Sequence, residues 1–179
     1  MRTAGIMGLT FAIAMIAAPV RGQNGATEIS ATLSGDQEVP LVSTQAQGKF
    51  HATIDEINME VRYELSYSGL ATTVRQAHIH FAQPFASGNI MVWLCDNPAT
   101  NPAPAPVDVP ECPQGGGMVT GTIRPADVGT GSGSQGIGTG EFAEFVAALR
   151  SGNSYVNVHT TQSQPGEIRG QIKPGQGPK

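Results

Sequence analysis

A strict alternation of apolar and polar side chains over residues 58–67 constrains the fold of this chain more than any other feature. Every second residue from Met59 to Tyr67 is apolar or aromatic, and the residues between them are polar or charged. Successive side chains of a strand point to opposite faces of a sheet, so the pattern predicts a strand with one buried face. The chain therefore needs a sheet with a core on one side.

Shorter apolar alternations and runs predict further strands, separated by turn-forming residues. Only residues 141–150 place their apolar side chains at helical spacing, and Gly152 follows them as a C-cap. We predict a mainly β fold, an antiparallel β-sandwich or barrel-like sheet of the immunoglobulin-like kind, with one short docked helix. The expected strands cover residues 29–33, 50–54, 58–67, 77–81, 90–95, 118–123, 155–160 and 167–172.

The N-terminus has the features of a secretory signal peptide. Arg2 supplies the positive charge, and residues 5–18 form an uncharged apolar run. Val20 and Gly22 fit the −3 and −1 positions of a cleavage site before Gln23, and cleavage a few residues later is the alternative. An uncleaved anchor is a further alternative, but the run of 14 residues is shorter than the roughly 20 that span a bilayer as a helix.

We expect a secreted or periplasmic protein with a signal peptide (1–22), a short lead (23–28), one domain (29–172) and a flexible tail (173–179). Without residues 1–22 the chain has 8 basic and 14 acidic side chains, a net charge of −6. It lacks the clustered Lys and Arg of a nucleic-acid-binding surface, and no second long apolar run follows the first. We therefore expect no nucleic-acid partner and no stable membrane span after cleavage.

The two cysteines, Cys95 and Cys112, flank a proline-rich segment. An even pair in an exported protein predicts a disulfide. A reactive or metal-binding thiol pair is the alternative, but the CxxC spacing typical of such pairs is absent.

Three of the four histidines form a candidate metal site. His78 and His80 are two residues apart on one expected strand, so their rings lie on the same face. His159 lies on another expected strand, on the face opposite Val156 and Val158. If the two strands are neighbours, the three imidazoles can hold one zinc or copper ion on the outer face of the sheet and leave a fourth position open. The alternative is that these side chains make ordinary hydrogen bonds.

The other polar residues of the expected strands point to no chemistry. His51 shares its face with Lys49 and is predicted to be solvated. Glu167 and Arg169 share a face and are predicted to form an exposed ion pair. The sequence contains neither a GxSxG nucleophile motif nor a phosphate-binding glycine loop, so we expect no catalytic residues and no organic cofactor.

Four segments carry a resemblance to a known family. They are ATLSGDQEVP (31–40), MEVRYELSYSGL (59–70), AHIHFA (77–82) and YVNVHTTQSQPGEIRGQI (155–172). Together they resemble the CHRD domain, the module named after chordin, over about residues 29–172. The chain departs from the family pattern at Leu41, where a second proline is common, and at Ala82, where a glycine is common. The resemblance implies an extracellular β-rich domain and no reaction.

A more distant likeness is to copper/zinc superoxide dismutase, in which an HxH strand and a later histidine hold copper on a β-barrel. The matching positions here are His78, His80 and His159, and the likeness extends to the fold. Only His51 is left over, which is too few for that enzyme's bridging histidine and zinc cluster. The likeness therefore implies at most a reduced, copper-only site.

These observations lead to two hypotheses about function. The first is an exported CHRD-domain protein with a non-enzymatic binding or structural role, whose partner is an envelope or extracellular protein or glycan. The alternative is a copper- or zinc-binding protein, for redox chemistry or metal scavenging, that uses His78, His80 and His159. The sequence favours a protein that is not an enzyme.

Overall fold

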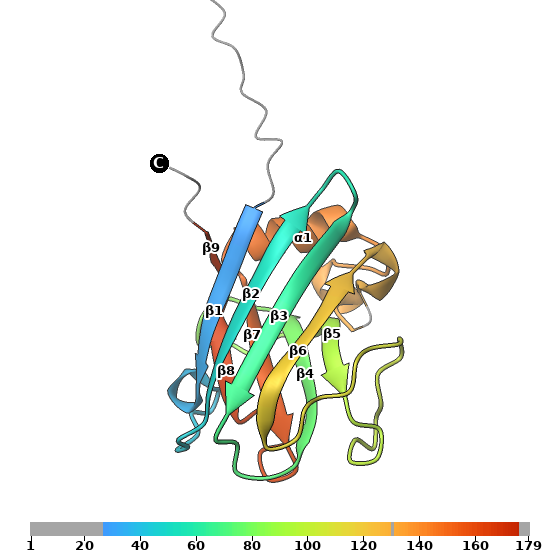
Figure 1. Cartoon of the computed structure of the whole chain (residues 1–179). Helices are drawn as coiled ribbons and strands as arrows, with labels where there is room; N and C mark the ends of the chain where they lie inside the picture. The colour runs from blue at the N-terminus through green and yellow to red at the C-terminus, as the bar shows by residue number, and fades with distance from the viewer. Residues whose placement is uncertain (1–26, 130, 176–179) are drawn as a thin grey trace, which may run out of the picture.

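A computed structural model describes residues 27–129 and 131–175 of the chain (Figure 1). It is mainly antiparallel β, a nearly closed barrel-like sheet with one short α-helix, as predicted. The strand order is β5-β4-β7-β8-β1-β2-β3-β6, and β9 pairs with β1. The predicted signal peptide and its cleavage site before Gln23 lie outside the described residues.

The eight predicted strands and the helix all form, with ends that differ by a few residues. β9 was not predicted; it lies in the segment expected to be a flexible tail and pairs with β1. The elements are β1 (Thr27–Ser34), β2 (Gln47–Asp55), β3 (Glu60–Ser68), β4 (Val74–Phe81), β5 (Ile90–Asp96), β6 (Gly116–Ile123), α1 (Phe142–Arg150), β7 (Ser154–Thr160), β8 (Ile168–Gln171) and β9 (Lys173–Pro174).

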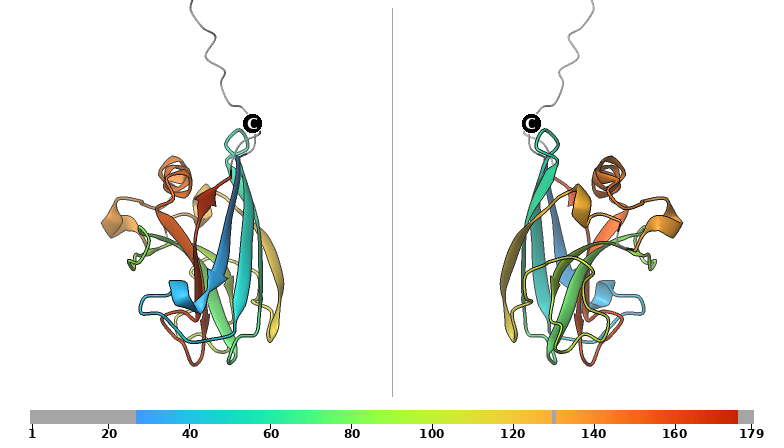
Figure 2. Two further views of the ribbon diagram at one scale, coloured as in Figure 1. Left: turned by 90° about the vertical axis from the view of Figure 1, so that its left-hand side faces the viewer. Right: turned by 90° about the vertical axis from the view of Figure 1, so that its right-hand side faces the viewer.

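The sheet folds into two layers around one core, with β1, β2, β3 and β6 on one side and β8, β7, β4 and β5 on the other (Figures 1 and 2). β3 keeps the predicted alternation, and Val61 and Leu65 are fully buried in the core. Met59 differs from the prediction, because it lies in the turn before β3 with a φ of 50° and is 54% exposed.

Helix α1 docks on the sheet as its apolar stripe predicted. Phe145 and Leu149 are buried in the core. The Glu141 carboxylate accepts a hydrogen bond from the Gly138 N–H (2.6 Å), and Gly152 follows the helix with a φ of 72°. Among the described residues, no helix is long and apolar enough to cross a membrane.

The predicted disulfide between Cys95 and Cys112 is present. It joins the end of β5 to the segment before β6 and closes the proline-rich loop. The Asp96 carboxylate organises this loop by accepting hydrogen bonds from the Asn101 side chain (2.6 Å) and the Ala105 N–H (3.0 Å).

Candidate metal centre

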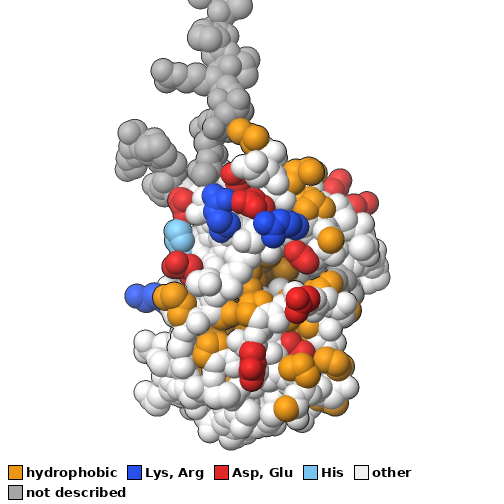
Figure 3. Space-filling view, turned by 45° about the vertical axis from the view of Figure 1, so that its right-hand side comes forward, with side chains coloured by type: hydrophobic (Ala, Val, Ile, Leu, Met, Phe, Trp, Pro, Cys, Tyr) orange, Lys and Arg blue, Asp and Glu red, His pale blue; other side chains and the backbone are white. Residues whose placement is uncertain are grey.

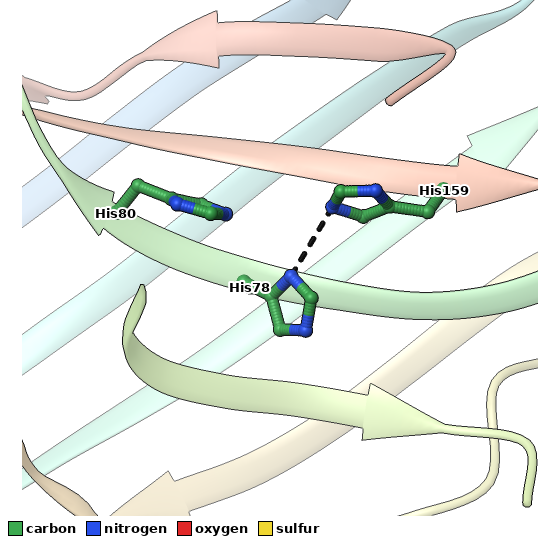
Figure 4. A group of neighbouring side chains, drawn as sticks. All are labelled: His78, His80 and His159. Atoms are coloured by element: carbon green, nitrogen blue, oxygen red, sulfur yellow. Dashed lines mark hydrogen bonds between the residues drawn. The ribbon is translucent and has the colours of Figure 1, made fainter. Parts of the chain in front are cut away.

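β4 and β7 are antiparallel neighbours, which the three-histidine hypothesis required. His78 lies opposite Asn157 and His80 opposite Tyr155 in their register. Ala77 and Ile79 of β4 point into the core, so His78 and His80 point away from it. His159 leaves β7 on the same side, and the three rings converge (Figure 4).

The ring nitrogens of the cluster are close enough to share one ion. His78 Nδ1 lies 3.1 Å from His159 Nε2. One ring nitrogen from each of the three histidines can be chosen so that all lie within 4.8 Å of one another. Two nitrogen ligands of one tetrahedral zinc ion lie about 3.4 Å apart, so side-chain movements of roughly 1 Å would close the cluster on a metal.

The cluster is buried, whereas the sequence predicted histidines on an outer face of the sheet. The exposed fractions of His78, His80 and His159 are 0%, 8% and 6%. The Trp93 ring packs edge-on against His78 at 4.2 Å between centroids, and the Tyr155 ring stacks on His80 at 4.7 Å. A period of two fixes the face on which a side chain lies, but it does not reveal what covers that face.

Backbone carbonyls set the tautomers of two of the histidines. His159 Nδ1 lies 2.7 Å from the Gln164 carbonyl, and His80 Nδ1 lies 2.9 Å from the Gly88 carbonyl. Since a carbonyl only accepts, each neutral ring carries its proton on Nδ1 and has a lone pair on Nε2. Metal-binding histidines are oriented by such bonds from their second nitrogen.

His78 has a different environment, because the backbone does not fix its tautomer. Its Nδ1 faces His159, and its Nε2 is buried without a hydrogen-bond partner among the described residues. The His80 Nε2 likewise has no partner there. A buried polar atom without a partner costs about 1–3 kcal/mol, so these atoms call for a ligand or another explanation.

All three imidazoles are held neutral. Burial is the main cause in each case, and it lowers the pKa of His80 and of His159 to about 4. Burial and the two neighbouring histidines hold the pKa of His78 well below its ordinary value. Neutral imidazole is the form that binds a metal.

A layer of polar side chains surrounds the cluster. The Arg169 guanidinium lies over the Tyr155 ring, 3.4 Å from its centroid, and donates to the Ala86 carbonyl (2.9 Å). Burial raises the pKa of Glu38 to about 7, against the opposing effects of the Val39 N–H, Arg169 and Asn157.

The predicted exposed ion pair between Glu167 and Arg169 is wrong. Both residues are buried, with exposed fractions of 1% and 2%. Glu167 instead accepts hydrogen bonds from the Thr44 hydroxyl (2.8 Å), the Ala71 N–H (2.9 Å) and the Thr160 hydroxyl (2.8 Å). The loops before β2 and β4 supply Thr44 and Ala71, and β7 itself supplies Thr160, so Glu167 is enclosed by loops as well as by the sheet.

The remaining candidate ligands lie elsewhere. His51 is more than half exposed, as predicted, and pairs with Glu28 at 2.7 Å. Cys95 and Cys112 are joined to each other and offer no thiolate. Among the described residues, the three histidines are therefore the one group of histidine, cysteine and acidic side chains arranged to hold a metal.

Sequence reasoning missed the residues that complete this site. Asn157 is two residues from His159, so the period of two puts it on the same face, but a single asparagine in a strand carries no signal of a role. The carbonyls of Gly88 and Gln164 carry no signal in a single sequence, because any residue can supply a carbonyl. Their contribution depends on loops whose course the strand pattern does not determine.

The molecule is thus an antiparallel β domain with a buried polar cluster between one sheet layer and its covering loops. The family profile of the CHRD domain matches residues 29–172, and the chain belongs to this family. Membership favours a non-enzymatic domain. No curated protein and no solved structure is significantly similar to the chain.

Proposed function

We propose that this protein is exported and binds one copper or zinc ion through His78, His80 and His159, without catalysing a reaction. The observation that carries the proposal is the convergence of three buried neutral imidazoles, two of them with Nε2 lone pairs set by backbone carbonyls. Its role would be to hold or scavenge the metal.

The donor set supports copper or zinc over other metals. Imidazole nitrogen suits zinc and copper, whereas magnesium and calcium require oxygen ligands. The three rings are neutral, so binding needs no buried thiolate or carboxylate to be deprotonated. The cluster lacks a histidine for a second metal, since His51 pairs with Glu28 instead.

Export is part of the proposal and is supported by two features. The sequence of residues 1–22 is typical of a signal peptide. The Cys95–Cys112 disulfide is a bond that forms and persists outside the reducing cytosol.

A partner in the envelope or outside the cell, either a protein or a glycan, belongs to the same proposal. On the face shown in Figure 3, acidic and basic side chains are interspersed and no extended basic patch is visible. This mixed surface favours such a partner over a nucleic acid.

The test is a copper and zinc titration of the chain from Gln23, produced without a histidine tag. We expect one ion per chain, and more than about 100-fold weaker binding in His80→Ala and in His159→Ala, since loss of a ligand costs more than loss of a second-layer partner. His51→Ala is the matched control and should bind like the wild type. Absence of stoichiometric metal, or full binding by His80→Ala, would overturn the proposal.

A further inference from the structure

Asn157 occupies the middle of the polar face on which the three histidines lie. It sits in β7, opposite His78 of β4 and Arg169 of β8, and it is two residues from His159. Its exposed fraction is 2%. A buried carboxamide must have its oxygen and its nitrogen accounted for.

The carboxamide oxygen points at the cluster. Asn157 Oδ1 lies 2.9 Å from His159 Nε2, while the amide nitrogen donates to the Pro165 carbonyl at 3.4 Å on the other side. The reverse orientation would place two acceptor oxygens against each other. In the orientation that the structure shows, Oδ1 faces the His159 ring nitrogen and the amide nitrogen keeps its hydrogen bond to the Pro165 carbonyl.

Two acceptors meet at this point. The Gln164 carbonyl keeps the proton of His159 on Nδ1, so Nε2 presents a lone pair to the Asn157 oxygen. His78 Nδ1, 3.1 Å from the same His159 nitrogen, can donate a proton to it, and a cation bound to His159 Nε2 and Asn157 Oδ1 would take the place of that proton.

We propose that Asn157 Oδ1 is the fourth ligand of the ion held by His78, His80 and His159. The inference rests on the proposed function, because it assigns a further ligand to the same site. A set of three nitrogens and one oxygen closes the position that three histidines alone leave open. A closed, buried four-ligand site retains a metal and does not present it to a substrate, and a tetrahedral set suits zinc.

The test compares zinc affinity and the cobalt(II) absorption spectrum of the chain from Gln23 with those of two variants. Asn157→Leu removes the oxygen at nearly constant size, and we expect zinc binding to weaken by roughly 10- to 100-fold, less than for loss of a histidine because water can replace a neutral amide oxygen. Its cobalt spectrum should also change, because water would replace the amide. Asn157→Asp offers an anionic oxygen at the same place, and it should bind zinc at least as tightly as the wild type.

The aspartate variant separates a ligand from a purely structural residue. A structural role predicts weaker binding in both variants, since a buried carboxylate without a metal is unfavourable. If the leucine variant fails to fold, Asn157→Asp purified with zinc decides the question. Asn153→Asp adds the same charge in an exposed turn, and it should leave affinity and spectrum unchanged.

The outcomes distinguish this inference from the proposed function. Wild-type affinity and spectrum in Asn157→Leu, or weakened binding in Asn157→Asp, would overturn the role of Asn157 and leave the three-histidine site in place. Failure of the wild-type chain to bind zinc or copper would instead overturn the proposed function.

Discussion

The burial of the histidines predicts that the metal-free protein loses stability as the pH falls from 8 to 5. Burial lowers the pKa of His80 and His159 to about 4, compared with an ordinary value of 6.5. The unfolded chain therefore binds protons that the folded chain excludes. Stability is fully present above about pH 6.5 and is lost as the pH falls toward 4.

The shifts give an approximate size for this loss. At pH 5, a histidine with a folded pKa of about 4 and an unfolded value of 6.5 contributes about 2 kcal/mol less to stability than at pH 8. His80 and His159 together then account for about 4 kcal/mol, and His78 adds to the loss.

Glu38 has the opposite effect on the pH dependence of stability, so a variant without its carboxyl group is needed to isolate the contribution of the histidines. Burial raises its pKa to about 7, so the folded chain takes up a proton that the unfolded chain takes up only near pH 4.5. This proton uptake raises the free energy of unfolding by about 2 to 3 kcal/mol between pH 8 and pH 5. Glu38→Gln abolishes it and should therefore show the larger loss of stability.

The assay is urea unfolding of Glu38→Gln and of the wild type at pH 8 and pH 5, with a chelator present. We expect the free energy of unfolding of Glu38→Gln to fall by about 4 kcal/mol or more from pH 8 to pH 5. That of the wild type should fall by less. Adding His159→Gln to the Glu38→Gln background should reduce the loss by about 2 kcal/mol. Equal stability of Glu38→Gln at the two pH values would show that burial does not hold the imidazoles neutral.

Two further predictions concern the framework of the site. Gly166→Ala should destabilise the protein by about 2–4 kcal/mol in urea unfolding. The reason is that Gly166 has a φ of 136° and a Cβ there would overlap the Glu38 carboxylate. An unchanged unfolding midpoint would show that this segment moves freely. The cysteines of the Cys95–Cys112 disulfide are 17 residues apart, and its reduction should lower the free energy of unfolding by about 3 kcal/mol. The measurement compares unfolding with and without reductant, and equal stabilities would show that the loop is held without the bond.

The strands were predictable because their signal is local. The alternation around Val61 and Leu65 arises from a face that packs on the core, and β3 has this property over its length. Met59 was misplaced because a turn residue can fall in phase with the strand that follows it. β9 left no pattern, since two residues are too few to show a period.

The convergence of the histidines was only partly predictable. HxH determines that His78 and His80 share a face, but the pairing of β4 with β7 joins segments about 80 residues apart. That pairing was assumed, and the structure shows it. The enclosure of the face could not be inferred, because it depends on loops that donate to Glu167 and accept from Arg169.

Buried polar atoms without a hydrogen-bond partner are concentrated on the enclosed face around the histidines. Most of its buried polar side chains are fully engaged; Glu167, for example, accepts three hydrogen bonds. Five buried side-chain atoms lack a partner among the described residues, and three of them belong to His78, His80 and Glu38. Two of these atoms are ring nitrogens of the histidine cluster, and a cation bound there would give both of them a partner.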